Sequence, residues 1–133
     1  AILEELQGVT PCIFVEFHAE ATSEKQAFAR YLDGRVSAIV GTHTHVQTAD
    51  EQVLPQGSAF ITDVGMTGPV DSVIGMKYST VLPRFMTLLP NRFEVASGPA
   101  VLSGMLIDVD QATGRASSVK RLQVPFDAGR RGN

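Results

Sequence analysis

Short apolar runs alternate with polar segments in the first third of the chain and predict two strands separated by one helix. The runs from Cys12 to Phe17 and from Val36 to Val40 are short and rich in β-branched or aromatic residues, as buried strands are. Between them, a capping-box spacing at Ser23–Gln26 starts a segment with apolar positions at helical spacing, and residues 33–34 (Asp-Gly) end it. The order strand, helix, strand predicts a βαβ unit with parallel strands.

The rest of the chain predicts a further helix and strands in one unit, 1–133. The expected elements are a helix end at Ile2–Gln7, a third strand at Ala59–Thr62, a helix at Thr80–Leu89 interrupted by Pro83, a strand at Arg92–Ala96, and a hairpin of Val101–Asp108 with Ala116–Val124. Residues 125–133 are polar and predict a frayed tail. The predicted fold class is α/β, opening with the βαβ unit and closing with the β-hairpin.

Composition narrows the classes of function. The chain has 133 residues, a net charge of -3 and no dense basic run before its last residues, which argues against a nucleic-acid-binding surface. No apolar run approaches the roughly 20 residues of a membrane span. A single cysteine, Cys12, excludes an internal disulfide framework and favours a reducing, cytoplasmic compartment. An anionic substrate would need a local positive centre, for which a metal ion is the obvious candidate.

All three histidines fall at the ends of predicted parallel strands. His18 follows the first strand, and His43 and His45 follow the second, so we expect them at the same carboxyl edge, where ligand sites of such sheets lie. In extended backbone the two histidines of an H-x-H pair lie on one face, roughly 6.5–7 Å apart, and reach different ions of a two-metal centre. Three histidines can also hold one zinc, and a single histidine at a strand end is often only a hydrogen-bonded structural residue.

Other candidates lie beside the histidines. Thr42 and Thr67 are expected to support the ligands or to contact substrate. Asp63 either orients an imidazole or caps the turn into Gly65, whose loop offers backbone N–H groups to a phosphate or forms a simple tight turn. Of the nearby carboxylates Glu16, Glu20 and Asp63, none has a spacing that singles it out as a ligand bridging two metals, whereas Asp50 and Glu51 are expected to be solvated loop charges.

Three motifs bear a resemblance to a known family. HAEATSEK (18–25), GTHTHVQTAD (41–50) and ITDVGMTGP (61–69) resemble, in order and spacing, the YmdB-type branch of the calcineurin-like metallophosphoesterases, from about Pro11 to about Arg121. The short GTHTH piece alone recurs more widely. The resemblance implies that this chain corresponds to the C-terminal half of a two-sheet sandwich flanked by helices, with a dinuclear metal site between the sheets.

The resemblance also implies ligands and chemistry. His18 and His43 would ligate one divalent ion and His45 the other, with Mn, Fe or Zn as the metal type. The remaining ligands, and the histidine that acts as general acid, would come from the N-terminal half, so no catalytic residue is expected in this chain. The implied substrates are phosphodiesters, notably 2′,3′- and 3′,5′-cyclic nucleotides.

Two functions remain open at this point. The first is the histidine half of a metallophosphodiesterase, with little or no activity without the N-terminal half as its partner; the start at Ala1 without a Met fits the second part of a longer protein. The alternative is a non-catalytic metal-binding or assembly domain derived from that family, holding one metal or none. Half a sandwich leaves an apolar face uncovered, so a homo-oligomer is also expected.

Overall fold

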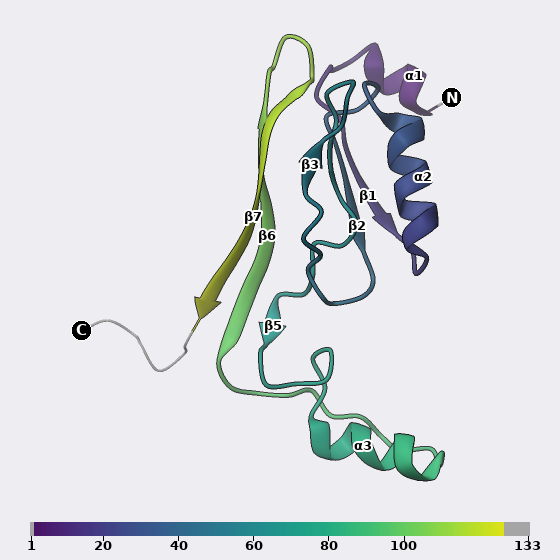
Figure 1. Ribbon diagram of the computed structural model, residues 1–133, viewed down its shortest axis with the longest axis vertical. Coiled ribbons are helices and arrows are strands. Elements are labelled where there is room, and N and C mark those ends of the chain that lie inside the picture. The colour runs from purple at the N-terminus through teal and green to yellow at the C-terminus, as the bar shows by residue number, and fades with distance from the viewer. Residues whose placement is uncertain (1, 127–133) are drawn as a thin grey trace, which may run out of the picture.

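The computed structural model describes residues 2–126 and contains two sheets with helices beside them (Figure 1). The first sheet has the order β1-β2-β4-β3, built from β1 (Phe14–His18), β2 (Ala38–Thr42), β4 (Ala59–Ile61) and β3 (Gln52–Val53). β1, β2 and β4 are parallel, and β3 pairs antiparallel with β4. Helix α2 (Thr22–Leu32) connects β1 to β2, so the predicted βαβ unit is confirmed.

The second sheet is antiparallel and has the order β5-β6-β7. Its strands are β5 (Gly68–Pro69), β6 (Ala100–Val109) and β7 (Ala116–Phe126), and β6 with β7 forms the predicted closing hairpin. Because β7 runs through Phe126, residues 125–126 are not part of a frayed tail; residues 127–133 lie outside the described residues. Helices α1 (Ile2–Gln7) and α3 (Tyr78–Thr87) lie at opposite ends of the molecule (Figure 1). The α/β fold with two sheets and flanking helices is therefore confirmed.

The central strands of the first sheet, β2 and β4, are buried on both faces by different partners. Ile39 and Phe60 face the helices and pack with Ala29 and Leu32 of α2. On the opposite face, the main buried contacts are between small side chains, Ala38 and Ala59 of this sheet and Ala116 of β7, with Met105, Ile107 and Val119 packed around them. Small residues allow the two sheets to approach closely, which places the carboxyl edge of the first sheet next to the second sheet.

Four local predictions differ from the structure. The first strand is not fully buried: Phe14 is 62% exposed, because β1 is an edge strand with no neighbour on its outer side among the described residues. Helix α2 begins one residue before Ser23, with Ala21 as its N-cap and no side-chain cap, so the capping box does not form. Residues 92–96 make only an isolated bridge at Val95 instead of a strand. Pro83 lies inside α3, costing one helical hydrogen bond without ending the helix.

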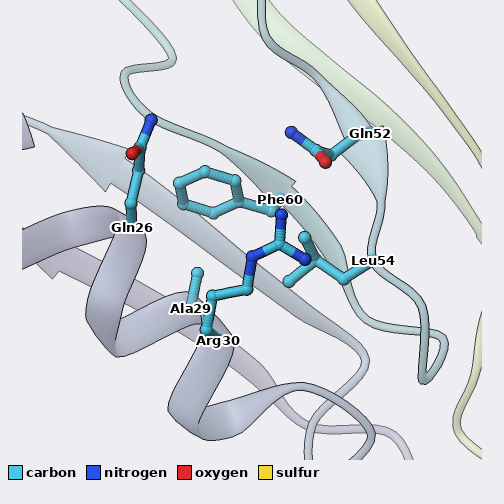
Figure 2. Close-up of a pocket in the computed structure, with 6 residues that line it drawn as sticks. All are labelled: Gln26, Ala29, Arg30, Gln52, Leu54 and Phe60. Carbon is cyan, nitrogen blue, oxygen red and sulfur yellow. The ribbon is translucent and has the colours of Figure 1, made fainter. Parts of the chain in front are cut away.

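One cavity lies on the side of the first sheet that packs against α2. It measures about 100 Å³ and lies between α2, β3 and β4, with Gln26 and Arg30 on the helix and Gln52 on β3 around it (Figure 2). Leu54 and Phe60 form its apolar wall. It contains none of the histidines, so it is not the predicted site. Within residues 2–126 no helix has the length and apolar character needed to cross a membrane.

Gly41 occupies a point where three elements meet too closely for a side chain. A Cβ on this residue would lie 1.8 Å from the carbonyl oxygen of Thr62 and 3.0 Å from Cδ of Lys25. We expect Gly41→Ala to lower the free energy of unfolding by about 1–3 kcal/mol or more, as overpacking of a core does. Urea denaturation measures the change. Gly104→Ala is the control, since its Cβ would approach nothing nearer than 3.7 Å; an equal loss in both variants would contradict the explanation.

Candidate functional site

The histidines lie at the predicted edge of the first sheet. His18 is the last residue of β1 and pairs in register with Thr42, the last residue of β2. His43 and His45 follow directly in the loop after β2. Parallel pairing thus brings residues from two distant parts of the chain to one edge.

His18 and His43 contact each other through ring nitrogens. His43 Nδ1 lies 3.0 Å from His18 Nε2, and the two rings are nearly perpendicular, with centroids 4.9 Å apart. Both residues are exposed, so the pair opens to solvent. Two neutral imidazoles that direct nitrogens at one another are suitable donors for a shared divalent metal ion.

A chain of hydrogen bonds determines the tautomer of His18. Thr42 Oγ1 donates to Glu16 Oε1 at 2.6 Å, and the same hydroxyl lies 2.9 Å from His18 Nδ1. Because the single hydroxyl proton goes to the carboxylate, Thr42 accepts from an Nδ1–H of His18. The lone pair of His18 is therefore on Nε2, the nitrogen that faces His43. Glu16, placed on the same face of β1 as His18, acts on this histidine through Thr42.

The extended H-x-H geometry predicted for the loop is wrong. His43 has a φ of 125° and His45 a φ of 65°, so the chain turns sharply after β2 instead of continuing as a strand. His45 leaves the other two histidines, and its Nδ1–H donates to the carbonyl oxygen of Ile74 at 2.9 Å. Across residues 2–126, no group of three His, Cys, Asp or Glu side chains is close enough to hold a metal ion. The structure thus brings together two of the three predicted ligands.

A buried ion pair lies directly beneath this loop. Lys25 Nζ is 2.9 Å from Asp63 Oδ2, and the two side chains are 1% and 0% exposed. Asp63 also accepts the backbone N–H of Thr44 at 2.8 Å and that of Gly65 at 2.9 Å. Burial by itself raises the pKa of Asp63, but these hydrogen bonds outweigh it and hold the pKa below its usual value. The carboxylate is therefore charged and fully partnered.

These contacts decide between the two predicted roles of Asp63. It caps the turn into Gly65, and among its hydrogen bonds there is none to an imidazole; it positions the histidines only through the Thr44 backbone. Since the Gly65 N–H is already bound to Asp63, that group is not free to meet a phosphate. Thr67 lies farther along the loop and is exposed, with its hydroxyl 3.5 Å from the Ser103 carbonyl.

Sequence reasoning missed the residues that hold the loop. Asp50 was expected to be solvated, yet Thr48 Oγ1 donates to it at 2.6 Å and both the N–H and the hydroxyl of Thr62 bond to it. Gln47 Nε2 lies within 3.0–3.2 Å of the carbonyl oxygens of Val64, Gly104 and Leu122, which connects the loop to the second sheet.

Glu51 and Lys25 also hold this region, and a sequence signal existed for only one of them. Glu51 was also expected to be solvated and instead pairs with Arg121 at 2.7 Å. For Lys25 a signal existed: together with Ala29 and Leu32 it has the i, i+4, i+7 spacing of the buried helix face.

Comparison with known proteins shows which family most of this chain matches. The family described as YmdB-like protein matches residues 1–122. The chain is 55% identical over 126 residues to the 2′,3′-cyclic-nucleotide 2′-phosphodiesterase of Bacillus subtilis (strain 168), covering 95% of this chain and 48% of that protein. The chain therefore spans about half the length of this curated relative.

Two solved structures have the same fold. A crystal structure of a hypothetical protein from Thermus thermophilus is 43% identical with a TM-score of 0.84, over 92% of this chain and 49% of that one. A crystal structure described as a novel phosphatase from Mycoplasma pneumoniae is 41% identical with a TM-score of 0.86, over 97% and 47%. Each similarity again covers about half of the other chain.

The buried ion pair can be tested against an exposed one. Lys25→Met keeps the volume but leaves Asp63 buried without its counter-ion, so we expect the free energy of unfolding to fall by about 3–5 kcal/mol. Lys77→Met is the matched control, because Lys77 pairs with Glu94 at 2.6 Å with 44% and 58% of the two side chains exposed, and should lose less than about 1 kcal/mol. Urea unfolding measures both, and similar losses would refute the assignment.

The hydrogen bonds of Asp50 predict a dependence on pH. Burial raises the pKa of this carboxyl, but the bonds from Thr48 and Thr62 outweigh burial and lower it. A pKa lowered by folding means that the stabilisation is complete above the unfolded pKa, about 3.9, and is lost as the pH falls through the folded value. The difference in unfolding free energy between wild type and Asp50→Asn should therefore shrink below about pH 4. A constant difference from pH 7 to pH 3 would rule this out.

Proposed function

The chain belongs to the YmdB-like protein family, and from this premise we propose that it supplies the histidine side of a metal-dependent phosphodiesterase site for cyclic nucleotides. The observation that supports this most directly is the approach of His18 Nε2 and His43 Nδ1 to 3.0 Å at the carboxyl edge of the sheet. The B. subtilis relative is named for the hydrolysis of 2′,3′-cyclic nucleotides. The phosphate of such a substrate is anionic, whereas the chain has a net negative charge. In the proposed site, metal ions would therefore supply the positive charge that attracts the phosphate.

In the proposed site His18 and His43 would hold one divalent ion of the Mn, Fe or Zn type and His45 the other, with the remaining ligands supplied by the N-terminal half. When bound, such ions would supply a hydroxide at neutral pH and would offset the negative charge that develops on the phosphate. The residues of this chain hold and orient the ligands. Glu16 and Thr42 leave the lone pair of His18 on Nε2, and the Ile74 carbonyl takes the Nδ1–H of His45, which leaves its Nε2 as the free donor atom.

The missing ligands require a partner, and the strand edges suggest where it docks. Among residues 2–126 no strand covers the outer edge of β1, and β5 pairs with β6 only at Ala100 and Val101, which leaves the rest of that β6 edge open. Between these two edges lies an apolar cavity of about 400 Å³ lined by Ile13, Phe14, Met105 and Ile107, among others. Unpaired edges beside an apolar opening are templates for added strands. We assign this opening to the N-terminal half of the same fold.

The alternative function is a non-catalytic metal-binding or assembly domain. It is favoured by one observation, the absence of a three-ligand group within residues 2–126. The apolar opening between β1 and β6 also predicts that the chain can associate with a second copy of itself.

Activity distinguishes the two functions. A chimera that joins the N-terminal half of the B. subtilis relative to this chain should hydrolyse bis-p-nitrophenyl phosphate with Mn²⁺, and the 133-residue chain alone should not. We expect His18→Ala and His43→Ala each to reduce the rate of the chimera by about 100-fold or more, because loss of a ligand removes the metal chemistry. Lys77→Met, at the exposed N-cap of α3, should leave the rate unchanged.

An inactive, folded chimera would support the non-catalytic alternative. Turnover by the isolated chain at the rate of the chimera would instead contradict the need for a second half.

A further inference from the structure

An apolar cavity of about 490 Å³ lies beside the candidate site and is separate from the opening between the sheets. Its walls come from helix α3, from the turn at residues 73–76 and from the histidine loop, and include His45, Ile74, Val81, Arg84, Phe85 and Phe93. We call it the α3 pocket. The opening assigned to the N-terminal half shares no lining residue with it. The two cavities are therefore separate.

The turn that forms one wall is locked to His45. Val73 and Met76 exchange backbone hydrogen bonds of 2.8 and 2.9 Å, which makes a two-residue turn with Ile74 and Gly75 at its centre. Ile74 has a φ of 46°, a conformation that a β-branched residue rarely adopts. Its carbonyl accepts the Nδ1–H of His45 at 2.9 Å while its side chain lines the pocket. Strain of this kind collects at binding sites, where surrounding contacts impose it.

The opposite wall supplies aromatic rings and a cation. Val81 anchors α3 and is buried, whereas Phe85 remains 71% exposed although it lines the cavity. The guanidinium carbon of Arg84 lies 5.5 Å above the centre of the Phe93 ring. In the part of the chain that the structure describes, no carboxylate forms an ion pair with Arg84. A guanidinium above a ring and free of a carboxylate is suited to a site for an aromatic group beside an anion.

Size and position fit the same ligand. The volume lies within the range of small-molecule sites, which are mostly apolar with a few polar groups. Because His45 forms part of the wall, a ligand in the α3 pocket extends directly to the atoms proposed to hold metal. We propose that the α3 pocket binds the nucleoside part of a nucleotide substrate, with the base against Phe85 and Phe93 and with Arg84 beside it. This rests on the proposed function for the phosphate, but base binding itself needs no metal.

Adenosine, which lacks a phosphate, tests the pocket independently of the reaction. An NMR titration of the 133-residue chain with adenosine, without metal ions, should show saturable binding. Phe85→Ala should weaken it about tenfold or more, the usual contribution of one base–aromatic stack. Met86→Ala is the matched control, because Met86 is the next residue on α3, is 75% exposed and does not line the pocket. Both side chains are exposed, so both variants should keep the wild-type urea midpoint.

The absence of saturable adenosine binding, or an equal effect of the two substitutions, would overturn the proposal. The chimera gives a second measurement, in which Phe85→Ala should lower kcat/KM for 2′,3′-cyclic AMP and leave that for glycerol 1,2-cyclic phosphate, which has no base, unchanged. An equal loss for both substrates would also overturn it. If the chimera hydrolyses neither substrate, the phosphodiesterase proposal fails, and the adenosine titration still decides whether the pocket binds a nucleoside.

Discussion

The buried ion pair between Lys25 and Asp63 is the interaction on which the site depends. The stem of Lys25 passes Gly41, where no side chain fits, and its ammonium reaches Asp63 after β4. One residue from each of the three motifs that resembled a known family therefore lies in this single contact. Two charges removed from water gain little net stability. The main effect of this ion pair is therefore to fix the position of the histidine loop. Through the Thr44 N–H, Asp63 holds the loop at the point between two histidines whose φ angles are both positive.

The sequence could predict whatever follows from local pattern and from parallel pairing. Apolar runs located β2, β4 and the closing hairpin, and the rule that parallel strands end at one edge placed His18 beside His43. The conformation of the loop after Thr42 could not be predicted in this way. It is imposed by a carboxylate 19 residues away from Thr44 and by a lysine 38 residues from that carboxylate. The same holds for β1, whose exposure depends on which chain segment lies beside it.

The proposed docking of an N-terminal half would explain the two open strand edges and the small number of ligands together. Relatives about twice as long share this fold over about half of their length. A sandwich divided between β1 and β6 loses the strands that would cover Phe14 and close the apolar cavity. Under the proposed function, the ligands that this chain does not supply would come from the other side of the same opening. The proposed N-terminal half would thus account for both the exposed apolar surface and the two-histidine cluster.

The turn at Ile74 contacts both His45 and the α3 pocket, and so lies between the two parts of the proposed site. Its carbonyl takes the proton-bearing nitrogen of His45, and its side chain forms the wall of the α3 pocket. A less strained residue at this position, such as glycine, would adopt the positive φ at no steric cost but would leave the wall without a side chain. The strain therefore arises because one residue both accepts the hydrogen bond from His45 and supplies a side chain to the pocket wall. A movement of this turn would change the pocket and the direction of the His45 ring together, so the proposed binding of a base would be coupled to the geometry at the phosphate.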